Sequence, residues 1–442
     1  MARDIIVGRL EADREKYGSR GMVLLGKQYV KMGRVTSLSN PIYLDVAGAH
    51  VVFICGKRGG GKSYTMGVVA EGMADLPDDV KQNLSFIFLD TMGVYWTMKY
   101  PNKKDETLLA DWGFKPKGLD IVIYTPISYY NKYKEEGIPT DRPFAIKPSE
   151  LDSMDWCSAF DLNPNDPMGI LIERVVHQLR KTKADYSVDD MVQAVQQDIR
   201  SEQVTKDALE NRLRSTEAWG VFDVKGTPLS ELAAPGQVTI LDVSCYATMP
   251  GGWKIKYLIV GLVSQKLFLQ RMTARKKEEF EMVHSTINYF STEDVGKKKQ
   301  EMPLVWLVID EAHEFLPRNE ADANAATQPL ITIMREGRQP GISLMLASQQ
   351  PGKIHTDVMT QSDIVLSHRI TARMDVDALG LLTQSYMREG LTQAVDELPR
   401  VKGAGVIFDD SNEKLYPMRV RPRFTWHGGE APSAVKIKKE EF

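Results

Sequence analysis

At 442 residues the chain is long enough for two or three domains, and 43% hydrophobic with 26% charged residues is ordinary for a soluble protein. The formal net charge of −3 excludes the overall basic surface of a simple nucleic-acid coat protein, so any DNA contact must be local. The three cysteines are widely spaced without a C-x-x-C pair, which argues against a disulfide framework or zinc site and indicates a reducing compartment.

The N-terminal segment, residues 1–48, is predicted to be a small β module. It holds three short apolar segments separated by Gly, Ser and Pro: Ile5–Val7, Met22–Leu25 and Ile42–Leu44. No apolar run suits a signal peptide, and no stretch approaches the roughly 18 apolar residues of a membrane span. We therefore expect a cytoplasmic protein without a membrane partner.

A glycine-rich turn then lies between an apolar strand pattern, Val51–Cys55, and a helical pattern. It matches G-x-x-x-x-G-K-[ST], in which glycines let successive N–H groups face one concavity and the helix N-terminus adds further donors. The predicted cradle consists of Gly56, Lys57, Gly59, Gly60, Gly61, Lys62, Ser63 and Tyr64. We expect it to bind ATP, with Lys62 reaching the β- and γ-phosphates and the Ser63 hydroxyl holding Mg²⁺.

The rest of the core, residues 49–425, is predicted to be an α/β domain with a mostly parallel sheet, because β-branched apolar runs alternate with helical patterns. The predicted strands are Phe86–Leu89, Ile121–Tyr124, Val238–Leu241, Leu304–Ile309, Ile342–Leu346 and Ile364–Leu366. Residues 151–234 have helical periodicity and are predicted to form an insertion. A long helix is expected over residues 255–275, and an exposed loop over 286–300.

The strand pattern Leu304–Ile309 runs directly into two acids, Asp310 and Glu311. Alone, this pattern equally fits a strand followed by an acidic helix cap. Paired with the glycine-rich turn it predicts a Walker B site, in which Asp310 acts on the metal through water and Glu311 polarises the water that attacks the γ-phosphate.

Two other enzyme classes have matching short motifs. Residues 310–313 spell DEAH, but those helicases need two tandem domains and only about 130 residues remain. Asp90–Gly93 fits D-x-x-G and Asn102–Asp105 fits N-K-x-D of GTPases. In a GTPase the N-K-x-D motif ends a strand of its own, well after the D-x-x-G motif. Here N-K-x-D begins only about ten residues after D-x-x-G, and the segment before it, residues 96–101, has no strand pattern.

Five segments together resemble the HerA branch of the HerA/FtsK motor ATPases, in its bacterial form. They are residues 56–63, Asp90–Tyr95, Ile240–Ser244, Ile333–Pro351 and Arg423–Gly429. The similarity spans roughly residues 40–430, and its most specific part is an arginine segment followed by a strand that ends in Ser-Gln-x-Pro. The sequence departs from the family pattern in two places. Gln350 stands where relatives usually carry arginine, and the N-terminal module is shorter than the β-barrel of archaeal HerA proteins.

The resemblance implies a RecA-like P-loop ATPase that assembles into a homo-oligomeric ring, usually a hexamer, and hydrolyses ATP between subunits. Such rings are helicase-like motors that move double-stranded DNA through a central channel. Matched residue by residue, the resemblance gives Lys62, Ser63, Asp310 and Glu311 the same roles as those above. It also implies that Gln349 senses the γ-phosphate and that Arg338 is the arginine finger, with Arg335 as the second candidate for that role.

Bacterial relatives often act with a nuclease or other effector protein, in DNA end processing or antiviral defence. The resemblance therefore implies a motor with such a partner; the alternative is a nucleotide-gated scaffold that assembles and regulates an effector without productive translocation. Candidate DNA-binding clusters are Lys103–Lys104, Arg180–Lys183 and Lys297–Lys299. The C-terminal tail, residues 426–442, is either disordered or, together with the preceding Phe424–Thr425, braces an adjacent subunit.

Overall fold

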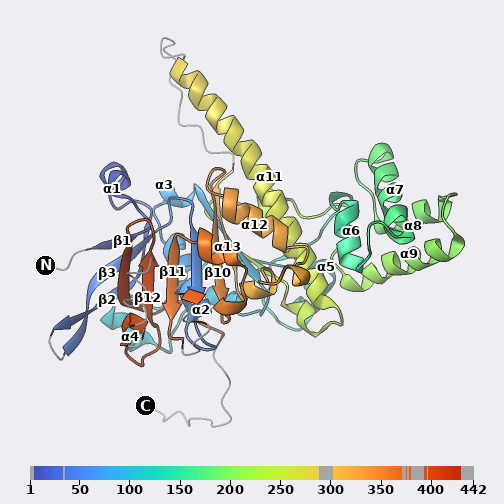
Figure 1. Cartoon of the computed structure of the whole chain (residues 1–442). Helices are drawn as coiled ribbons and strands as arrows, with labels where there is room; N and C mark the ends of the chain where they lie inside the picture. Colours follow the sequence, from blue (N-terminus) through green and yellow to red (C-terminus); the bar gives the residue numbers. More distant parts are fainter. Residues whose placement is uncertain are drawn as a thin grey trace, which may run out of the picture.

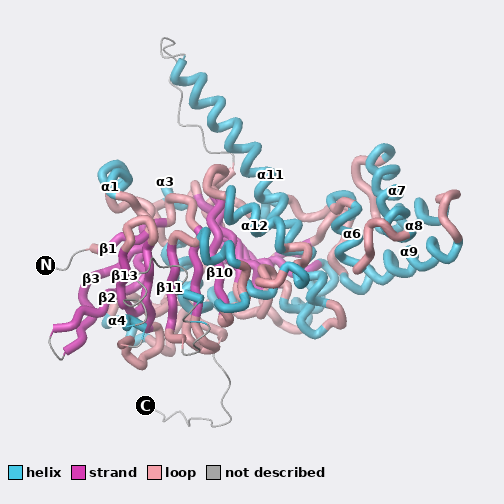
Figure 2. The backbone as a smooth tube through the Cα atoms, viewed as in Figure 1, coloured by secondary structure: helices cyan, strands magenta, loops and turns pink. Residues whose placement is uncertain are grey.

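The computed structural model describes residues 4–32, 35–287, 302–370 and 397–429, with 375, 378–379 and 393–395 between the last two ranges. Thirteen strands form one sheet in the order β1-β3-β2-β13-β12-β11-β4-β10-β9-β5-β8-β6-β7 (Figures 1 and 2). The strands are β1 (Ile5–Val7), β2 (Met22–Met32), β3 (Val35–Asp45), β4 (Val51–Cys55), β5 (Leu84–Asp90), β6 (Ile121–Pro126), β7 (Arg142–Phe144), β8 (Val238–Asp242), β9 (Leu304–Ile309), β10 (Ile342–Ser348), β11 (Ile364–His368), β12 (Ala404–Asp409) and β13 (Lys414–Val420).

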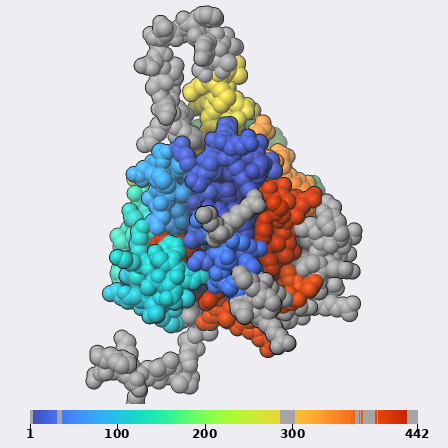
Figure 3. Space-filling view, turned by 90° about the vertical axis from the view of Figure 1, so that its left-hand side faces the viewer, coloured from blue at the N-terminus to red at the C-terminus, as the bar shows by residue number. Residues whose placement is uncertain are grey.

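All neighbours from β11 to β7 pair in parallel, as the apolar runs predict. Strands β12, β13, β2 and β3 then add to β11 in antiparallel pairs. Because β2 pairs with β13, the strands of the predicted N-terminal module extend the sheet of the core. Figure 3 shows residues from the N-terminal part of the chain, in blue, beside residues from its C-terminal part, in red, on one face.

The helices between the strands are α1 (Glu11–Tyr17), α2 (Lys62–Ala74), α3 (Asp78–Lys81), α4 (Glu106–Asp111), α5 (Ile127–Glu135), α6 (Ser153–Phe160), α7 (Pro167–Thr182), α8 (Val188–Gln197), α9 (Gln203–Ser215), α10 (Leu229–Leu232), α11 (Gly252–Ile287), α12 (Thr327–Glu336) and α13 (Thr356–Gln361). The region predicted as a helical insertion holds α6 to α10, and α7 to α9 extend from the sheet as a lobe (Figure 1). Helix α11 is longer than predicted and projects from the body. No helix among these residues has the length and apolar character to cross a bilayer.

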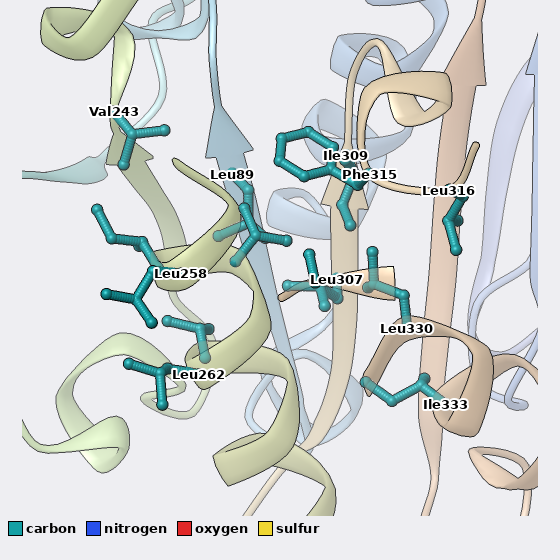
Figure 4. Packing of buried hydrophobic residues seen from close by; sticks show 14 of the residues in the cluster. Leu89, Val243, Leu258, Leu262, Leu307, Ile309, Phe315, Leu316, Leu330 and Ile333 are labelled. Atoms are coloured by element: carbon teal, nitrogen blue, oxygen red, sulfur yellow. The ribbon is translucent and has the colours of Figure 1, made fainter. Parts of the chain in front are cut away.

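Alternate strand side chains enter two separate hydrophobic clusters, one on each face of the sheet. Leu307 and Ile309 of β9 pack in one cluster, whereas Trp306 and Val308 pack in the other. Helices α11 and α12 cover the first face through Leu258, Leu262, Leu330 and Ile333 (Figure 4). Helix α2 covers the opposite face through Met66, Val69 and Met73. The sheet is therefore fixed from both sides, so the loops at its carboxyl edge start from rigid positions.

Candidate nucleotide-binding and catalytic site

Three adjacent parallel strands bring the glycine-rich turn, the two acids and Gln349 to one edge of the sheet. Strand β10 lies between β4 and β9, with Ser348 opposite Cys55 and Leu346 opposite Ile309. The glycine-rich turn follows β4, Asp310 follows β9 and Gln349 follows β10. Ligands of open α/β sheets bind at this carboxyl edge, so the strand order supports the predicted location of the site.

The glycine-rich turn has the backbone of an anion cradle. Gly59 and Gly61 have φ angles of 73° and 112°, which side chains rarely allow, and a Cβ on Gly61 would lie 3.3 Å from Cε1 of His368. Helix α2 begins at Lys62, which leaves the N–H groups of its first turn available at the loop. The Lys62 ammonium is buried and donates to the carbonyl oxygen of Gly56 at 3.2 Å.

The predicted magnesium residues, Ser63 and Asp310, are in direct contact. The Ser63 hydroxyl donates to Oδ2 of Asp310 at 2.5 Å, although 247 positions separate the two residues in the chain. A hydroxyl and a carboxylate beside a phosphate cradle are the hard oxygen donors that Mg²⁺ takes, with nucleotide phosphates and water as the remaining ligands. The described residues contain no group of three or more His, Cys, Asp or Glu that could hold a metal by themselves. The donor set thus fits a magnesium ion that arrives with the nucleotide.

The hydroxyl of Tyr95 also contacts this carboxylate. It donates to the same Oδ2 atom of Asp310 at 3.0 Å. Burial, with the negative charges of Asp310 and Asp90, holds the pKa of Tyr95 well above its ordinary value, so the phenol remains a donor. Tyr95 belongs to a segment that the sequence singled out, but no local pattern indicates a contact with a residue 215 positions away.

Glu311, the predicted base, is held in an unusual conformation. Its φ of 51° is left-handed, and its N–H donates to Oδ1 of Asp310 at 2.9 Å. Oε1 accepts a hydrogen bond from Nε2 of Gln349 at 3.1 Å, while Oε2 is buried without a hydrogen bond among the described residues. Burial, then the charge of Asp310, raises the pKa of Glu311, which suits a carboxylate that takes a proton from water.

Two histidines that the sequence analysis did not assign lie beside these groups. His313 Nδ1 lies 3.5 Å from Oε2 of Glu311 and within hydrogen-bond distance, 3.2 Å, of the Ser348 hydroxyl. His368 is fully buried under the glycine-rich turn, with Nε2 2.8 Å from the Thr65 hydroxyl. Burial lowers the pKa of His368 to about 4, so it is neutral at physiological pH and supports the cradle as a packing group.

The two candidate arginines lie near the opposite edge of the sheet from the glycine-rich turn. Arg335, on α12, forms an ion pair with Asp357 of α13 at 2.6 Å. Arg338 follows α12, is exposed, and has no ion-pair or hydrogen-bond partner for its guanidinium among the described residues. Strand β10 runs for seven residues between Arg338 and the catalytic edge, a separation of roughly 20 Å. Neither arginine is therefore brought to the nucleotide cradle of its own chain.

A cavity of about 610 Å³ opens at the segment that follows Glu311 in the chain. It is lined by His313, Glu314, Pro317, Arg318, Asn319, Asp322, Gln350, Gly352 and Lys353. Gln350, the residue that departs from the family pattern, thus faces this cavity, and Arg318 and Lys353 supply its positive charge.

Two buried carboxyl groups lie farther along the same edge. Asp90 ends β5 and pairs in register with Asp242 at the end of β8. Burial, then the charge of Asp242, raises the pKa of Asp90 to about 7. Asp90 accepts hydrogen bonds from the N–H groups of Gly93 at 2.7 Å and Tyr95 at 2.9 Å, so it fixes the turn that carries Tyr95.

The last described segment, residues 421–429, packs on its own P-loop helix. Glu71 of α2 is fully buried and accepts hydrogen bonds from Arg421 at 2.7 Å and from the N–H of Thr425 at 2.9 Å. Phe424 and Thr425, which suggested a brace on an adjacent subunit, are buried within this chain because they complete the partners of Glu71. The predicted tail beyond residue 429 lies outside the described residues.

The remaining motifs also have definite positions. Asn102 of the GTPase-like motif donates to its neighbour Asp105 and to the carbonyl oxygen of Arg423, so its amide has a structural role. Of the basic clusters, Lys183 pairs with Asp190, and Lys297–Lys299 lies outside the described residues. Cys55, Cys157 and Cys245 are all free thiols.

Comparison with known proteins finds relatives for the part of the chain that holds the glycine-rich turn. Residues 30–249 match the family described as "Helicase HerA, central domain". The probable DNA double-strand break repair helicase HerA of Methanocaldococcus jannaschii is 31% identical over 151 residues, and that of Pyrococcus furiosus is 29% identical over 149 residues. Each match covers 32% of this chain but only 27% and 26% of the two relatives, so the chain spans about a quarter of their length.

A solved structure extends the likeness to the whole fold. VirB4 of Thermoanaerobacter pseudethanolicus superposes with a TM-score of 0.57 over 92% of this chain and 97% of VirB4, at 12% identity. That likeness concerns the fold, while the family match covers the cradle and the Asp90 and Asp242 strands. Together with the contact between Ser63 and Asp310, these findings identify the chain as a HerA-type P-loop ATPase.

Proposed function

We propose that this ATPase hydrolyses ATP at an interface between two copies of itself. The observation that carries the proposal is the edge at which Ser63, Asp310 and Glu311 meet while Arg338 stays exposed near the opposite edge. Lys62 neutralises the β- and γ-phosphates, Glu311 takes a proton from the attacking water, and Gln349 reports the γ-phosphate to Glu311. Mg²⁺ held by Ser63 and Asp310 supplies charge neutralisation when it is bound with ATP.

The position of Arg338 supports a finger acting in trans. An arginine near the amino edge of the strands cannot reach a nucleotide at the carboxyl edge of its own sheet, but it can reach that of a neighbour in a head-to-tail ring. Such a guanidinium contributes roughly 10³ to 10⁵ in rate. Arg335 is the weaker candidate because Asp357 already pairs with it. We expect a closed ring, with six subunits as the working number.

We further propose that ATP turnover drives movement along double-stranded DNA in cooperation with a nuclease or another effector, in DNA end processing or antiviral defence. Support comes from the match to the central domain of helicase HerA and from two relatives named as DNA double-strand break repair helicases. Because the matches span a quarter of those relatives, their activity is carried over here as part of the proposal.

The test compares ATP turnover with and without long duplex DNA, and a triplex-displacement assay then reads translocation directly. The proposal predicts turnover that rises with DNA and displacement that requires ATP. Turnover that ignores DNA but changes with an effector protein would instead support a nucleotide-gated scaffold.

A further inference from the structure

We propose that Tyr95 is a positioning residue for magnesium: its hydroxyl fixes the carboxylate of Asp310 in the orientation that the metal site needs. This inference rests on the proposed magnesium role of Ser63 and Asp310. It adds a third residue, from a different strand connection, to the site.

Hydrogen bonds to both oxygens of Asp310 fix the orientation of its carboxylate. Oδ2 accepts two hydrogen bonds, from the Ser63 hydroxyl at 2.5 Å and the Tyr95 hydroxyl at 3.0 Å. Oδ1 accepts one from the N–H of Glu311 at 2.9 Å. Without the phenol, the orientation of the carboxylate depends on the N–H of Glu311 and on the Ser63 hydroxyl, which is itself a proposed magnesium ligand.

Tyr95 can impose this orientation because it is itself immobilised. Its side chain is 1% exposed, and its ring stacks on Phe88 with 4.1 Å between ring centroids. Its N–H donates to Asp90 at 2.9 Å. The buried ammonium of Lys256, in the first turn of α11, donates to the carbonyl oxygen of Thr91 at 2.9 Å and so holds the same turn from the other side.

The arrangement is that of a support for a metal site. A group hydrogen-bonded to a metal-side carboxylate typically changes metal affinity by about 10- to 100-fold when it is removed. The phenol does not need to touch the metal or the phosphates for this effect. Its loss should therefore weaken metal binding while leaving the phosphate cradle, built from residues 56–63, intact.

The decisive variant is Tyr95→Phe, which keeps the ring against Phe88 and removes only the hydroxyl. Mn²⁺ is the probe, titrated by electron paramagnetic resonance in the presence of a non-hydrolysable ATP analogue. We expect the dissociation constant for Mn²⁺ to rise by about tenfold or more. Binding of the analogue without metal should equal that of the unmodified protein.

The matched control is Tyr246→Phe. Tyr246 is also fully buried, but its hydroxyl donates to the carbonyl oxygen of Trp219 at 2.8 Å. This variant should bind Mn²⁺ normally. Steady-state turnover gives a second reading: Tyr95→Phe should need more Mg²⁺ for half-maximal rate, yet approach the normal maximal rate at saturating Mg²⁺.

Unchanged Mn²⁺ affinity in Tyr95→Phe would overturn the inference, as would an equal loss of metal-free analogue binding, which indicates a general structural role. Asp310→Asn separates this failure from that of the proposed function. If Asp310→Asn also binds Mn²⁺ normally, the magnesium assignment itself is wrong. If it binds Mn²⁺ weakly while Tyr95→Phe does not, only the role of Tyr95 is rejected.

Discussion

At the scale of single residues, the decisive group is the carboxylate of Glu311, whose two oxygens have different neighbours. Gln349 donates to Oε1 of Glu311, whereas Oε2 is buried with no hydrogen bond among the described residues. His313 Nδ1 lies 3.5 Å from this second oxygen. Glu311 is thus held between Gln349 and His313, next to the carboxylate of Asp310.

Replacing this carboxylate by an amide tests its role. Glu311→Gln keeps the size of the side chain and removes its basicity, so ATP hydrolysis should fall by about 10²- to 10⁴-fold. Binding of a fluorescent ATP analogue should change less than about threefold, and exposed Glu320→Gln should hydrolyse ATP normally. Retained hydrolysis in Glu311→Gln would show that another group activates the water.

Asp90 predicts a pH dependence of stability. Its pKa is raised by burial, then by Asp242, to about 7, so the folded chain keeps a proton that the unfolded chain loses near pH 4. Its contribution to folding stability is therefore fully present below about pH 4 and is lost as the pH rises to about 7.

Asp90→Asn removes this contribution. The free energy of unfolding of the unmodified protein minus that of the variant should decrease between about pH 4 and 7 and then level off. Denaturant unfolding at several pH values measures both. A difference that stays constant across the window would mean that Asp90 is ionised in the folded protein throughout.

Sequence reasoning predicted site residues that have local signatures and did not predict those whose partners are distant in the chain. Lys62 and Ser63 follow from the spacing of the glycine-rich turn, and Asp310 from an apolar strand that ends in acids. Tyr95 and His313 carry no such signature, because a phenol or an imidazole is identified as part of a site only by what the fold places next to it. Arg338 stays a prediction, since its proposed partner lies on another chain.

At the scale of elements, helix α2 is held in place by buried ion pairs with the C-terminal segment. Its buried Glu71 binds Arg421 and Arg423, which are themselves buried, so three charged groups share a buried site. Gly67 of the same helix leaves room for Arg423, because a Cβ there would lie 2.5 Å from the guanidinium. The C-terminal segment thus holds the helix that begins at the nucleotide cradle.

This arrangement predicts a large effect on stability. Glu71→Ala leaves two buried guanidinium groups without their carboxylate and should lower the free energy of unfolding by about 3–5 kcal/mol. Urea denaturation measures the change, and Glu173→Ala on the exposed face of α7 should cost less than about 0.5 kcal/mol. A cost below about 1 kcal/mol for Glu71→Ala would mean that the arginines find water or other partners.

The elements that sequence reasoning described least well are those whose residues are polar. The strands of the core were predicted because Val, Ile and Leu dominate them. Strands β2 and β3 extend through polar residues to eleven residues each, since pairing with each other and with β13 stabilises them. Helix α11 continues past residue 275 through charged residues that favour a helix without packing. No local pattern indicates that Glu71 is buried, because its partner Arg421 lies 350 positions away in the chain.

At the scale of the whole molecule, the two edges of the sheet face opposite ways, and the proposed function makes one edge the donor side and the other the acceptor side. The acceptor side holds the cradle, Glu311 and the cavity lined by His313 and Gln350. Arg338 lies near the donor edge. In the proposed ring, a head-to-tail contact would bring Arg338 of one subunit to the cradle of the next, so hydrolysis would depend on assembly.

Mixing two inactive variants tests this claim most directly. Lys62→Ala removes the phosphate contact but keeps the finger, and Arg338→Ala keeps the cradle but removes the finger. Each alone should hydrolyse ATP at least about 10³-fold more slowly than the unmodified protein. Reassembled in equal amounts, they should recover roughly a quarter of normal turnover, because a quarter of randomly formed interfaces join an intact cradle to an intact arginine. Normal turnover by Arg338→Ala alone, or no recovery in a mixture that forms rings, would contradict the account.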